Sequence, residues 1–301
     1  MARQYARRTF LRRTPNKLLD QYFQQRRVEI DAPWADLTET GIEPLDDALD
    51  AVPNDVLRRV DGEFSQIMQM ASAKGVATTL EEAASRGQDG SEQFAGMSND
   101  YERAMWTFLN EPARFIAAGA FHEMDRRTFS WHRFVGLRLE AETDDGTLDV
   151  FGAALAAHYR RQGRGRHCHV DVYRRVGPDR YCYFAYPEDA ASTDLGYDEQ
   201  GRFQRRPRQS AFEVIFVYRP EEGTTELYAR GNKRQKEELA EIFCVNALGL
   251  TGLPDENGRE PFNLAVLKDP TFTFPTDPRD GVQSVDVRLL RLDLPDRKSV
   301  V

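Results

Sequence analysis

Apolar residues in the first 130 positions recur every three or four residues, the spacing that gathers side chains on one face of an α-helix. The clearest stripe runs from Val56 through Phe64 to Ile67, and Asn54 precedes it as a capping residue. Other stripes begin near Pro15, Pro44, Asp100 and Pro112. We therefore predict a helical region over residues 14–132, with these stripes packed as its core.

From Phe134 onward the apolar period shortens to two, which places alternate side chains on opposite faces of a strand. Strands are predicted at 135–141, 167–175, 180–186, 211–219, 224–230, 262–268 and 284–294. Helices are predicted at 147–161, after a turn at residues 144–146, and at 233–248, ending at Gly249. The predicted fold class is α+β: a helical N-terminal region followed by a mixed, largely antiparallel sheet with two helices, in a domain spanning 133–301.

Two segments lack a clear helix or strand pattern. Residues 1–13 are predicted to form a basic arm, with Tyr5, Phe10 and Leu11 available to anchor it. Arg7-Arg8-Thr9-Phe10-Leu11-Arg12 resembles the twin-arginine export signal, but no apolar run follows it, so we do not expect export. Residues 187–210 are predicted to be a long polar connection without regular structure.

The composition narrows the class of protein. Of 301 residues, 40% are hydrophobic and 30% charged, which is typical of a globular protein and excludes collagen-like or wholly disordered chains. No uninterrupted apolar stretch reaches the roughly 18 residues of a membrane-spanning helix. Cys168, Cys182 and Cys244 are too few for a disulfide framework and indicate a reducing compartment. We therefore expect a cytoplasmic protein without a transmembrane segment.

The net charge of −8 hides a strong segregation of charge along the chain. Residues 1–30 hold eight Lys or Arg against two acidic residues, whereas residues 31–100 hold four against fifteen. Residues 151–236 are basic again, with sixteen against eleven. An acidic protein repels a polyanion at long range, so nucleic-acid binding requires the basic segments to meet on one surface.

The start of the last predicted helix carries three cations, although the helix dipole disfavours cations there unless an anion binds. The predicted anion-binding residues of this segment are Arg230, Gly231, Asn232, Lys233, Arg234 and Lys236. Gly231 would let an anion approach the backbone, Asn232 would cap the helix, and free N–H groups would point at the anion. The alternative is that the cations reach Glu237, Glu238 and Glu241 of their own helix.

Two further arginine runs support an anion-binding surface. The residues assigned to this surface are Arg164, Arg166, Arg174, Arg205 and Arg206. Interleaved tyrosines, among them Tyr159 and Tyr183, could stack on bases, or they could form ordinary cross-strand pairs.

The sharpest metal-like motif is His167-Cys168-His169-Val170-Asp171. On a strand, His167, His169 and Asp171 project from one face, so three ligand-type residues could converge. The motif resembles the opening of the metallo-β-lactamase motif, which implies a metal-dependent hydrolase or phosphoesterase. The resemblance ends after five residues, because Val172 follows where that motif has a histidine. The alternative is a half-exposed strand with its polar face outward.

The chain contains no nucleophile elbow, Walker-type loop, zinc-protease helix or complete dinucleotide fingerprint, so we predict no catalytic residues and no cofactor. The leading hypothesis is a non-enzymatic interaction protein. It would bind an anionic partner, nucleic acid first, through an Arg-rich surface of the C-terminal domain, and a protein partner through the helical region. Two alternatives stay open: the metal-dependent enzyme, and a structural subunit of a bacterial multiprotein assembly whose basic segments pair with each other or with an acidic segment such as residues 31–55.

Overall fold

The computed structural model describes residues 5–127, 129–176, 179–198, 200–254, 265–269, 271–276 and 282–286. The chain divides into two units, Met1–Arg259 and Glu260–Val301. The larger unit is an α+β structure, as predicted, with a helical N-terminal region followed by an antiparallel sheet. Among the residues described, no helix is long and apolar enough to cross a membrane.

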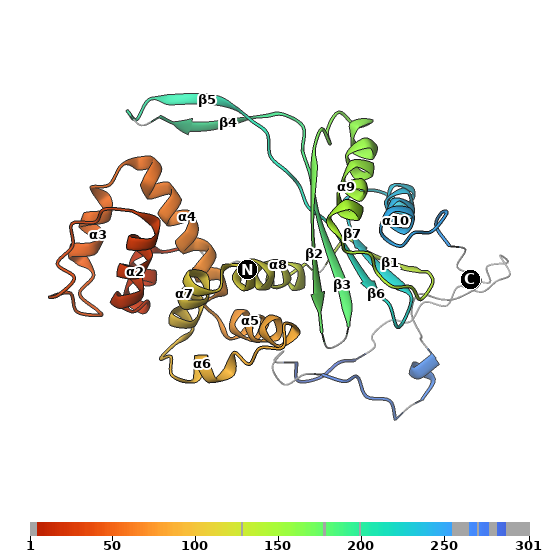
Figure 1. The fold of residues 1–301 in the computed structure, drawn as a ribbon, viewed down its shortest axis with the longest axis horizontal. Coiled ribbons are helices and arrows are strands. Elements are labelled where there is room, and N and C mark those ends of the chain that lie inside the picture. Colours follow the sequence, from red (N-terminus) through yellow and green to blue (C-terminus); the bar gives the residue numbers. More distant parts are fainter. Residues whose placement is uncertain are drawn as a thin grey trace. The chain divides into compact units, whose positions relative to one another are not determined.

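Regular elements fill most of the larger unit (Figure 1). Its helices are α1 (Arg7–Arg13), α2 (Asn16–Arg26), α3 (Glu43–Asp50), α4 (Asn54–Met70), α5 (Ala73–Ser85), α6 (Ser91–Ala95), α7 (Asp100–Asn110), α8 (Pro112–Asp125), α9 (Asp145–Arg160) and α10 (Lys233–Ala247). Its strands are β1 (Trp131–Val135), β2 (Cys168–Arg175), β3 (Arg180–Pro187), β4 (Ser192–Tyr197), β5 (Phe203–Arg208), β6 (Val214–Arg219) and β7 (Thr224–Tyr228).

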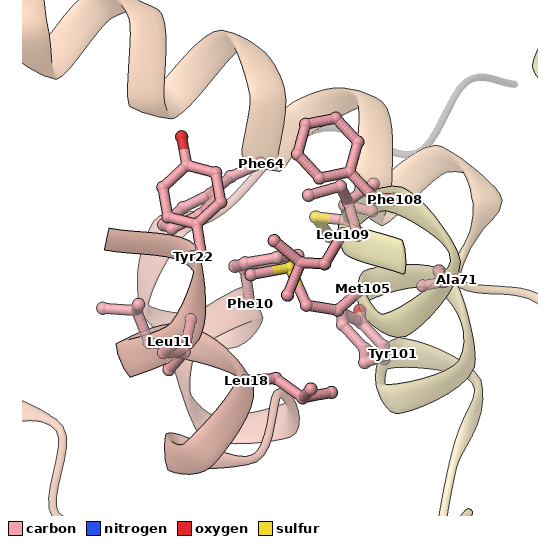
Figure 2. Close-up of a cluster of buried hydrophobic side chains, with 14 of the residues drawn as sticks. Phe10, Leu11, Leu18, Tyr22, Phe64, Ala71, Tyr101, Met105, Phe108 and Leu109 are labelled. Carbon is pink, nitrogen blue, oxygen red and sulfur yellow. The ribbon is translucent and has the colours of Figure 1, made fainter. Parts of the chain in front are cut away.

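Aromatic and aliphatic side chains hold α1, α2, α4 and α7 together (Figure 2). The rings of Phe10 and Phe64 stack with centroids 4.5 Å apart, and the ring of Tyr22 lies 4.8 Å from that of Phe64. Phe10 and Leu11 are fully buried, which contributes about 1.5–3 kcal/mol for each side chain. The predicted basic arm is therefore a packed helix over residues 7–13, and the anchoring role of Phe10 and Leu11 is confirmed.

The arginines of α1 pair with the acidic helix α3. Nε of Arg7 lies 2.8 Å from Oδ1 of Asp46, and Nε of Arg8 lies 2.7 Å from Oδ2 of the same carboxylate. Arg12 lies 3.6 Å from Glu43. Within this one chain, the first basic segment is thus compensated by part of the acidic segment 31–55.

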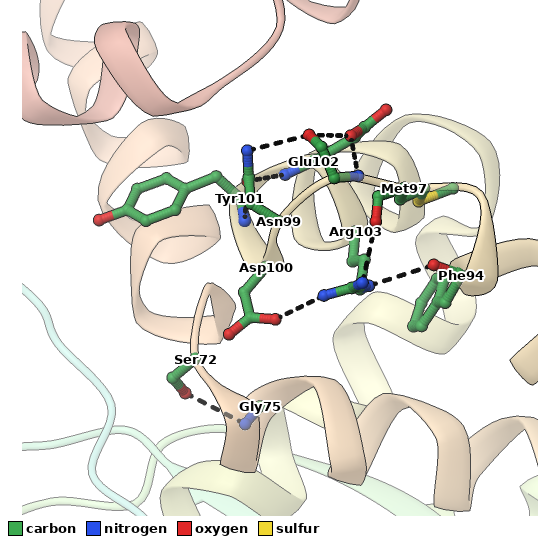
Figure 3. A network of polar contacts seen from close by, with 10 residues as sticks. Ser72, Gly75, Phe94, Met97, Asn99, Asp100, Tyr101, Glu102 and Arg103 are labelled. Atoms are coloured by element: carbon green, nitrogen blue, oxygen red, sulfur yellow. Dashed lines mark hydrogen bonds and ion pairs between the residues drawn. The ribbon is translucent and has the colours of Figure 1, made fainter.

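Polar side chains satisfy the free N–H groups at the start of α7 (Figure 3). Oδ1 of Asn99 accepts hydrogen bonds from the backbone N–H groups of Tyr101 and Glu102, at 2.8 and 3.0 Å. Asp144 caps α9 in the same way, accepting from the backbone N–H of Thr147 at 3.0 Å. Residues 144–146 therefore begin a helix, where the sequence predicted a turn, because an acidic side chain suits the positive end of the helix dipole.

Two other helix boundaries can be compared with the sequence prediction: the start of α4 differs from it, and the end of α10 agrees with it. Asn54, predicted to cap α4, is instead the first residue of that helix, and Pro53 precedes it without a side-chain cap. Gly249 follows α10 with φ of 64°, the left-handed conformation predicted for a C-terminal glycine.

The main sheet has the strand order β1-β7-β6-β3-β2, and each of its pairings is antiparallel. Helices cover both faces of the central strands β3 and β6, which explains their continuous apolar runs. Tyr183 and Phe216 pack in the core that includes residues of α9 and α10. Phe184 and Ile215 pack in the opposite core, with Phe121 of α8.

Only the first residue of the predicted strand 135–141 belongs to a strand, because β1 ends at Val135. The buried hydroxyl of Tyr218 takes the place of a neighbouring strand beyond that point. It accepts from the backbone N–H of Leu139 at 2.8 Å and lies 2.9 Å from the carbonyl oxygen of Leu137. The alternating pattern exists because Leu139 and Ala141 pack against the core.

The predicted connection 187–210 contains a β-hairpin, which we call the arm and which comprises residues 192–208 (Figure 1). Asp198 closes its turn by accepting hydrogen bonds from two backbone N–H groups. Tyr197 and Phe203 face each other across the two strands and are 59% and 54% exposed. The polar composition of this segment does not indicate strands. The hairpin is held by the hydrogen bonds between its two strands and by its turn, and Arg58 of α4 donates to the carbonyl oxygen of Tyr197 at 3.1 Å.

The smaller unit has one described regular element, the 3₁₀ helix η1 (Ala265–Lys268). The prediction of a strand at 262–268 is therefore wrong over these four residues, because a short apolar run does not by itself distinguish strand from helix. Residues 284–286 are not in a strand. The rest of the two predicted strands, 262–264 and 287–294, lies outside the described residues.

Candidate anion pocket

Two parts of the chain that are distant in the sequence line a cavity of about 110 Å³. They are the end of α9 with the loop after it, and the start of α10 with the residues just before it. Its lining residues are His158, Tyr159, Gln162, Arg164, Arg230, Gly231, Gln235 and Leu239. We call this cavity the anion pocket. A cavity of this volume leaves room for one small anion, such as a phosphate group.

Two glycines fold the chain back so that Arg164 returns to α9. Gly163 and Gly165 have φ of 75° and 77°, a conformation that favours glycine. A Cβ atom on Gly165 would lie 2.7 Å from the carbonyl oxygen of Ala156, so a larger residue does not fit there. The guanidinium of Arg164 lies over the ring of Phe212 at 4.6 Å, and this cation–π contact holds the charge at the pocket.

The two arginines of the pocket keep hydrogen-bond donors available. Nη2 of Arg164 donates to the side chain of Gln162 at 3.0 Å, whereas Nη1 lies 3.5 Å from Asp189, which is long for a hydrogen bond. Arg230 is exposed and, within the part of the chain described, has no hydrogen bond or ion pair. Since a guanidinium carries five N–H donors, both groups can still bind an anion.

A capping box closes the start of α10 and confirms the predicted capping role of Asn232. Its Oδ1 accepts from the backbone N–H of Gln235 at 3.0 Å, and the side chain of Gln235 accepts from the backbone N–H of Asn232 at 3.0 Å. Gly231 has φ of 138°, and a Cβ atom there would lie 2.7 Å from Oε1 of Gln235. The positive end of the helix dipole borders the pocket, because Gly231 and Gln235 line it.

His158 is a titratable side chain of the pocket that is 8% exposed, and its Nδ1 lies 3.7 Å from Glu238. Its Nε2 is buried and has no hydrogen-bond partner among the described atoms. Burial lowers the pKa of His158 below 6.5; Glu238 opposes this shift, and Arg161 and Arg164 add to it. Because this nitrogen is buried away from the open space, an anion in the pocket would be bound by the arginines and not by His158.

The three cations at the start of α10 do not line the pocket. Nζ of Lys233 lies 3.7 Å from Glu237, and Nε of Arg234 lies 3.2 Å from Glu238. Lys236 donates to a backbone carbonyl oxygen before β1, at 2.7 Å. For Lys233 and Arg234, the structure thus has the alternative arrangement, in which the cations reach acids of their own helix.

The remaining predicted arginines lie in other places. Arg174 forms a two-pronged ion pair with Asp179 at 2.8 and 2.7 Å, at the opposite end of β2 from the pocket loop. Arg205 and Arg206 belong to the arm, and Arg166 is exposed just before β2. Arg174 is therefore separated from the pocket loop by the length of an eight-residue strand, at about 3.3 Å per residue. The pocket gathers Arg164, Arg230 and Gly231.

The tyrosines considered for base stacking include two core residues. Tyr159 is 3% exposed and Tyr183 is fully buried, with its hydroxyl donating to the carbonyl oxygen of Glu142 at 2.8 Å. Burial also raises the pKa of Tyr159 to about 12. Stacking on bases is therefore wrong for Tyr159 and Tyr183, whose rings are covered by protein.

The metal-like motif has its polar residues outward, as one of its two interpretations predicted. Val170 is buried, whereas the side chains of His167 and His169 are 79% and 73% exposed. Nε2 of His169 lies 2.9 Å from Asp171, and Nε2 of His167 lies 3.9 Å from Glu188. Among the residues that the structure describes, no group of three or more His, Cys, Asp or Glu could hold a metal ion. The strand with an outward polar face therefore accounts for the motif.

The cysteines are not activated. Cys182 and Cys244 are buried in the core, as predicted, and burial raises their pKa values to about 12 and about 11. Burial likewise raises the pKa of Cys168 to about 12. A thiolate is the nucleophilic form, so these thiols lack the chemistry of a catalytic cysteine at neutral pH.

Sequence reasoning missed His158, Gln162 and Gln235 as pocket residues. Gln235 had a usable signal, because it stands three positions after Asn232 in the spacing of a capping box. His158 had none, since a single histidine in a helix does not indicate which loop will fold over it.

No protein family, curated protein or solved structure matches the chain.

Proposed function

We propose that this protein is a non-enzymatic binding protein that holds a phosphate group of an anionic partner, nucleic acid first, in the anion pocket. The observation that carries the proposal is that Arg164 and Arg230, from distant segments, line one small cavity at the start of α10. Guanidinium groups bind phosphate through paired donors, and the helix start adds positive potential. The proposed setting is the cytoplasm, where the three free cysteines would stay reduced.

Exposed cations beside the pocket favour a chain of phosphates over an isolated ion. The side chains of Lys233 and Arg234 are 78% and 86% exposed, and their ion pairs are with acids one helical turn away. Such pairs contribute only about 0.2–0.5 kcal/mol, so a neighbouring phosphate can replace the glutamate. One phosphate would enter the pocket, and adjacent phosphates of the same strand would contact these cations.

The test measures the binding of fluorescein-labelled 20-nucleotide single-stranded and duplex DNA and RNA by fluorescence anisotropy, over a range of salt concentrations. We expect the parent protein to bind at least one of them, with an affinity that falls as salt rises. Arg164→Ala together with Arg230→Ala should weaken binding about tenfold and reduce the salt slope by about 2. The control is Arg174→Ala, which removes an arginine already paired with Asp179 and should change affinity less than twofold.

Two results would contradict the proposal. If the parent binds no nucleic acid, a second titration with inorganic phosphate separates the alternatives: binding of phosphate alone would keep the pocket and reject the nucleic-acid partner. If the double variant and the control lose affinity equally, the binding surface lies outside the anion pocket.

A further inference from the structure

A second cavity, of about 460 Å³, lies in the helical region and is independent of the anion pocket. Its walls come from α2, α4, α7 and α8, and Met70, Phe108, Phe115 and Ile116 supply apolar side chains. The rings of Phe108 and Phe115 meet edge to face, with centroids 5.1 Å apart and an interplanar angle of 83°. A cavity of this volume, apolar with a few polar groups, is the usual form of a small-molecule site.

A glycine in the middle of α8 keeps this cavity open. Gly119 lines it, and a Cβ atom added there would meet no other atom within 4 Å. Glycine is among the least favourable residues in a helix interior, and no packing constraint requires it at this position. A side chain at position 119 would project into the cavity, so the glycine preserves space that a ligand can use.

The charged groups of the lining already have partners. Nε of Arg26 lies 2.9 Å from Oε2 of Glu63, and the guanidinium also lies over the ring of Phe108 at 4.8 Å. Glu123 pairs with Arg126 at 2.7 Å. A charged ligand would therefore find no unpaired opposite charge in this lining, whereas an uncharged ligand would lose nothing.

His122 supplies the polar group that lacks a partner. It lines the cavity and is 7% exposed. Its Nδ1 is buried away from the open space, so a ligand would meet the ring at Nε2, which has no hydrogen bond within the described part of the chain. Burial lowers the pKa of His122, so the imidazole is neutral at pH 7 and can exchange one hydrogen bond with a ligand.

We infer that this cavity binds an uncharged aromatic molecule of about two fused rings that carries one hydrogen-bonding group. Phe108 and Phe115 line the cavity with aromatic atoms, which favours contact with a planar ring, and Nε2 of His122 would hold the polar group of the ligand. This inference goes beyond the proposed function, since none of these residues belongs to the anion pocket.

The experiment uses 2-naphthol as the probe and calorimetric titration of the full-length chain as the measurement. We expect saturable binding with one site per chain. Gly119→Leu, which fills the cavity, should weaken binding at least tenfold. The matched control is Gly62→Leu, which replaces another helix-interior glycine with free space around it but outside this cavity. Gly62→Leu should leave the affinity for 2-naphthol unchanged, and circular dichroism checks that both variants fold.

Two further titrations test the chemistry of the ligand. His122→Leu should weaken binding of 2-naphthol several-fold but leave naphthalene unaffected, because naphthalene lacks the hydroxyl. 1-Decanol should bind less tightly than 2-naphthol. The inference is overturned if 2-naphthol does not bind, if Gly119→Leu and Gly62→Leu behave alike, or if 1-decanol binds more tightly.

Discussion

Arg175 at the end of β2 joins the sheet to helix α8 through Asp125: its Nη1 lies 3.0 Å from both carboxylate oxygens of that residue. The same guanidinium donates to Glu81 of α5, at 2.5 Å from Nη2. The side chain of Arg175 is only 12% exposed. One mostly buried arginine side chain thus connects two helices of the N-terminal region to the edge strand of the sheet.

Arg175→Met should lower the free energy of unfolding by about 2 kcal/mol, because it removes the shared partner of two partly exposed acidic side chains. Urea unfolding followed by circular dichroism measures the effect. Arg174→Ala is the control, since the side chain of Arg174 is 56% exposed and its ion pair should contribute less than about 1 kcal/mol. Equal losses in the two variants would contradict the connecting role of Arg175.

Tyr218→Phe should cost about 1.5–2 kcal/mol. The change leaves the backbone N–H of Leu139 without its acceptor in a partly buried position, and an unmade buried hydrogen bond carries the full desolvation penalty. Chemical denaturation again gives the value. Tyr181→Phe provides the comparison, because within the described residues the hydroxyl of Tyr181 makes no hydrogen bond; a similar cost there would show that ring packing, not the hydroxyl, is responsible.

The raised pKa values of the three thiols predict slow reaction with thiol reagents. In the folded protein at pH 8, Ellman's reagent should modify none of Cys168, Cys182 and Cys244 within minutes, because their pKa values of about 12, about 12 and about 11 leave almost no thiolate. In urea all three should react at once. Rapid modification of one thiol in the folded state would contradict the burial of that thiol.

Stability should fall on the acid side of pH 6.5. Burial lowers the pKa of both His122 and His158 in the folded state, so below 6.5 the unfolded chain binds protons that the folded chain does not. Their contribution is present above 6.5 and is lost as the pH falls. Unfolding free energies measured between pH 7.5 and 5.5 should show this decline, and His122→Leu should make it shallower. An unchanged slope in that variant would rule out His122 as a cause.

Excision of the arm should leave the rest of the protein folded. Replacing residues 191–209 by two glycines removes strands that pair only with each other, while the bridge between Glu188 and Ala211 at its base remains. The melting temperature should change by only a few degrees. A loss of cooperative unfolding would show that the arm contributes to the core.

The sequence predicts best where a local signal decides the structure. Pro112 at the start of α8, the central apolar strands and Gly249 after α10 all lie as their local patterns indicate. The prediction fails where a residue that is distant in the sequence determines the local structure. After Val135, the segment with a strand-like pattern is hydrogen-bonded to the hydroxyl of Tyr218 and not to a neighbouring strand. Nothing near Arg164 in the chain indicates that Arg230 will line the same cavity.

The pairing of Arg7 and Arg8 with Asp46 also affects how the whole molecule behaves in solution. The positive charges of Arg7 and Arg8 are compensated within the helical region. Residues 31–100 hold fifteen acidic residues against four basic ones, so the region keeps an excess of negative charge. Among the described residues, exposed arginines without an ion pair include Arg161 and Arg166 after α9, Arg230 before α10, and Arg205 and Arg206 in the arm. At low ionic strength, where the Debye length reaches about 30 Å, one preparation should therefore be retained by both anion- and cation-exchange resins.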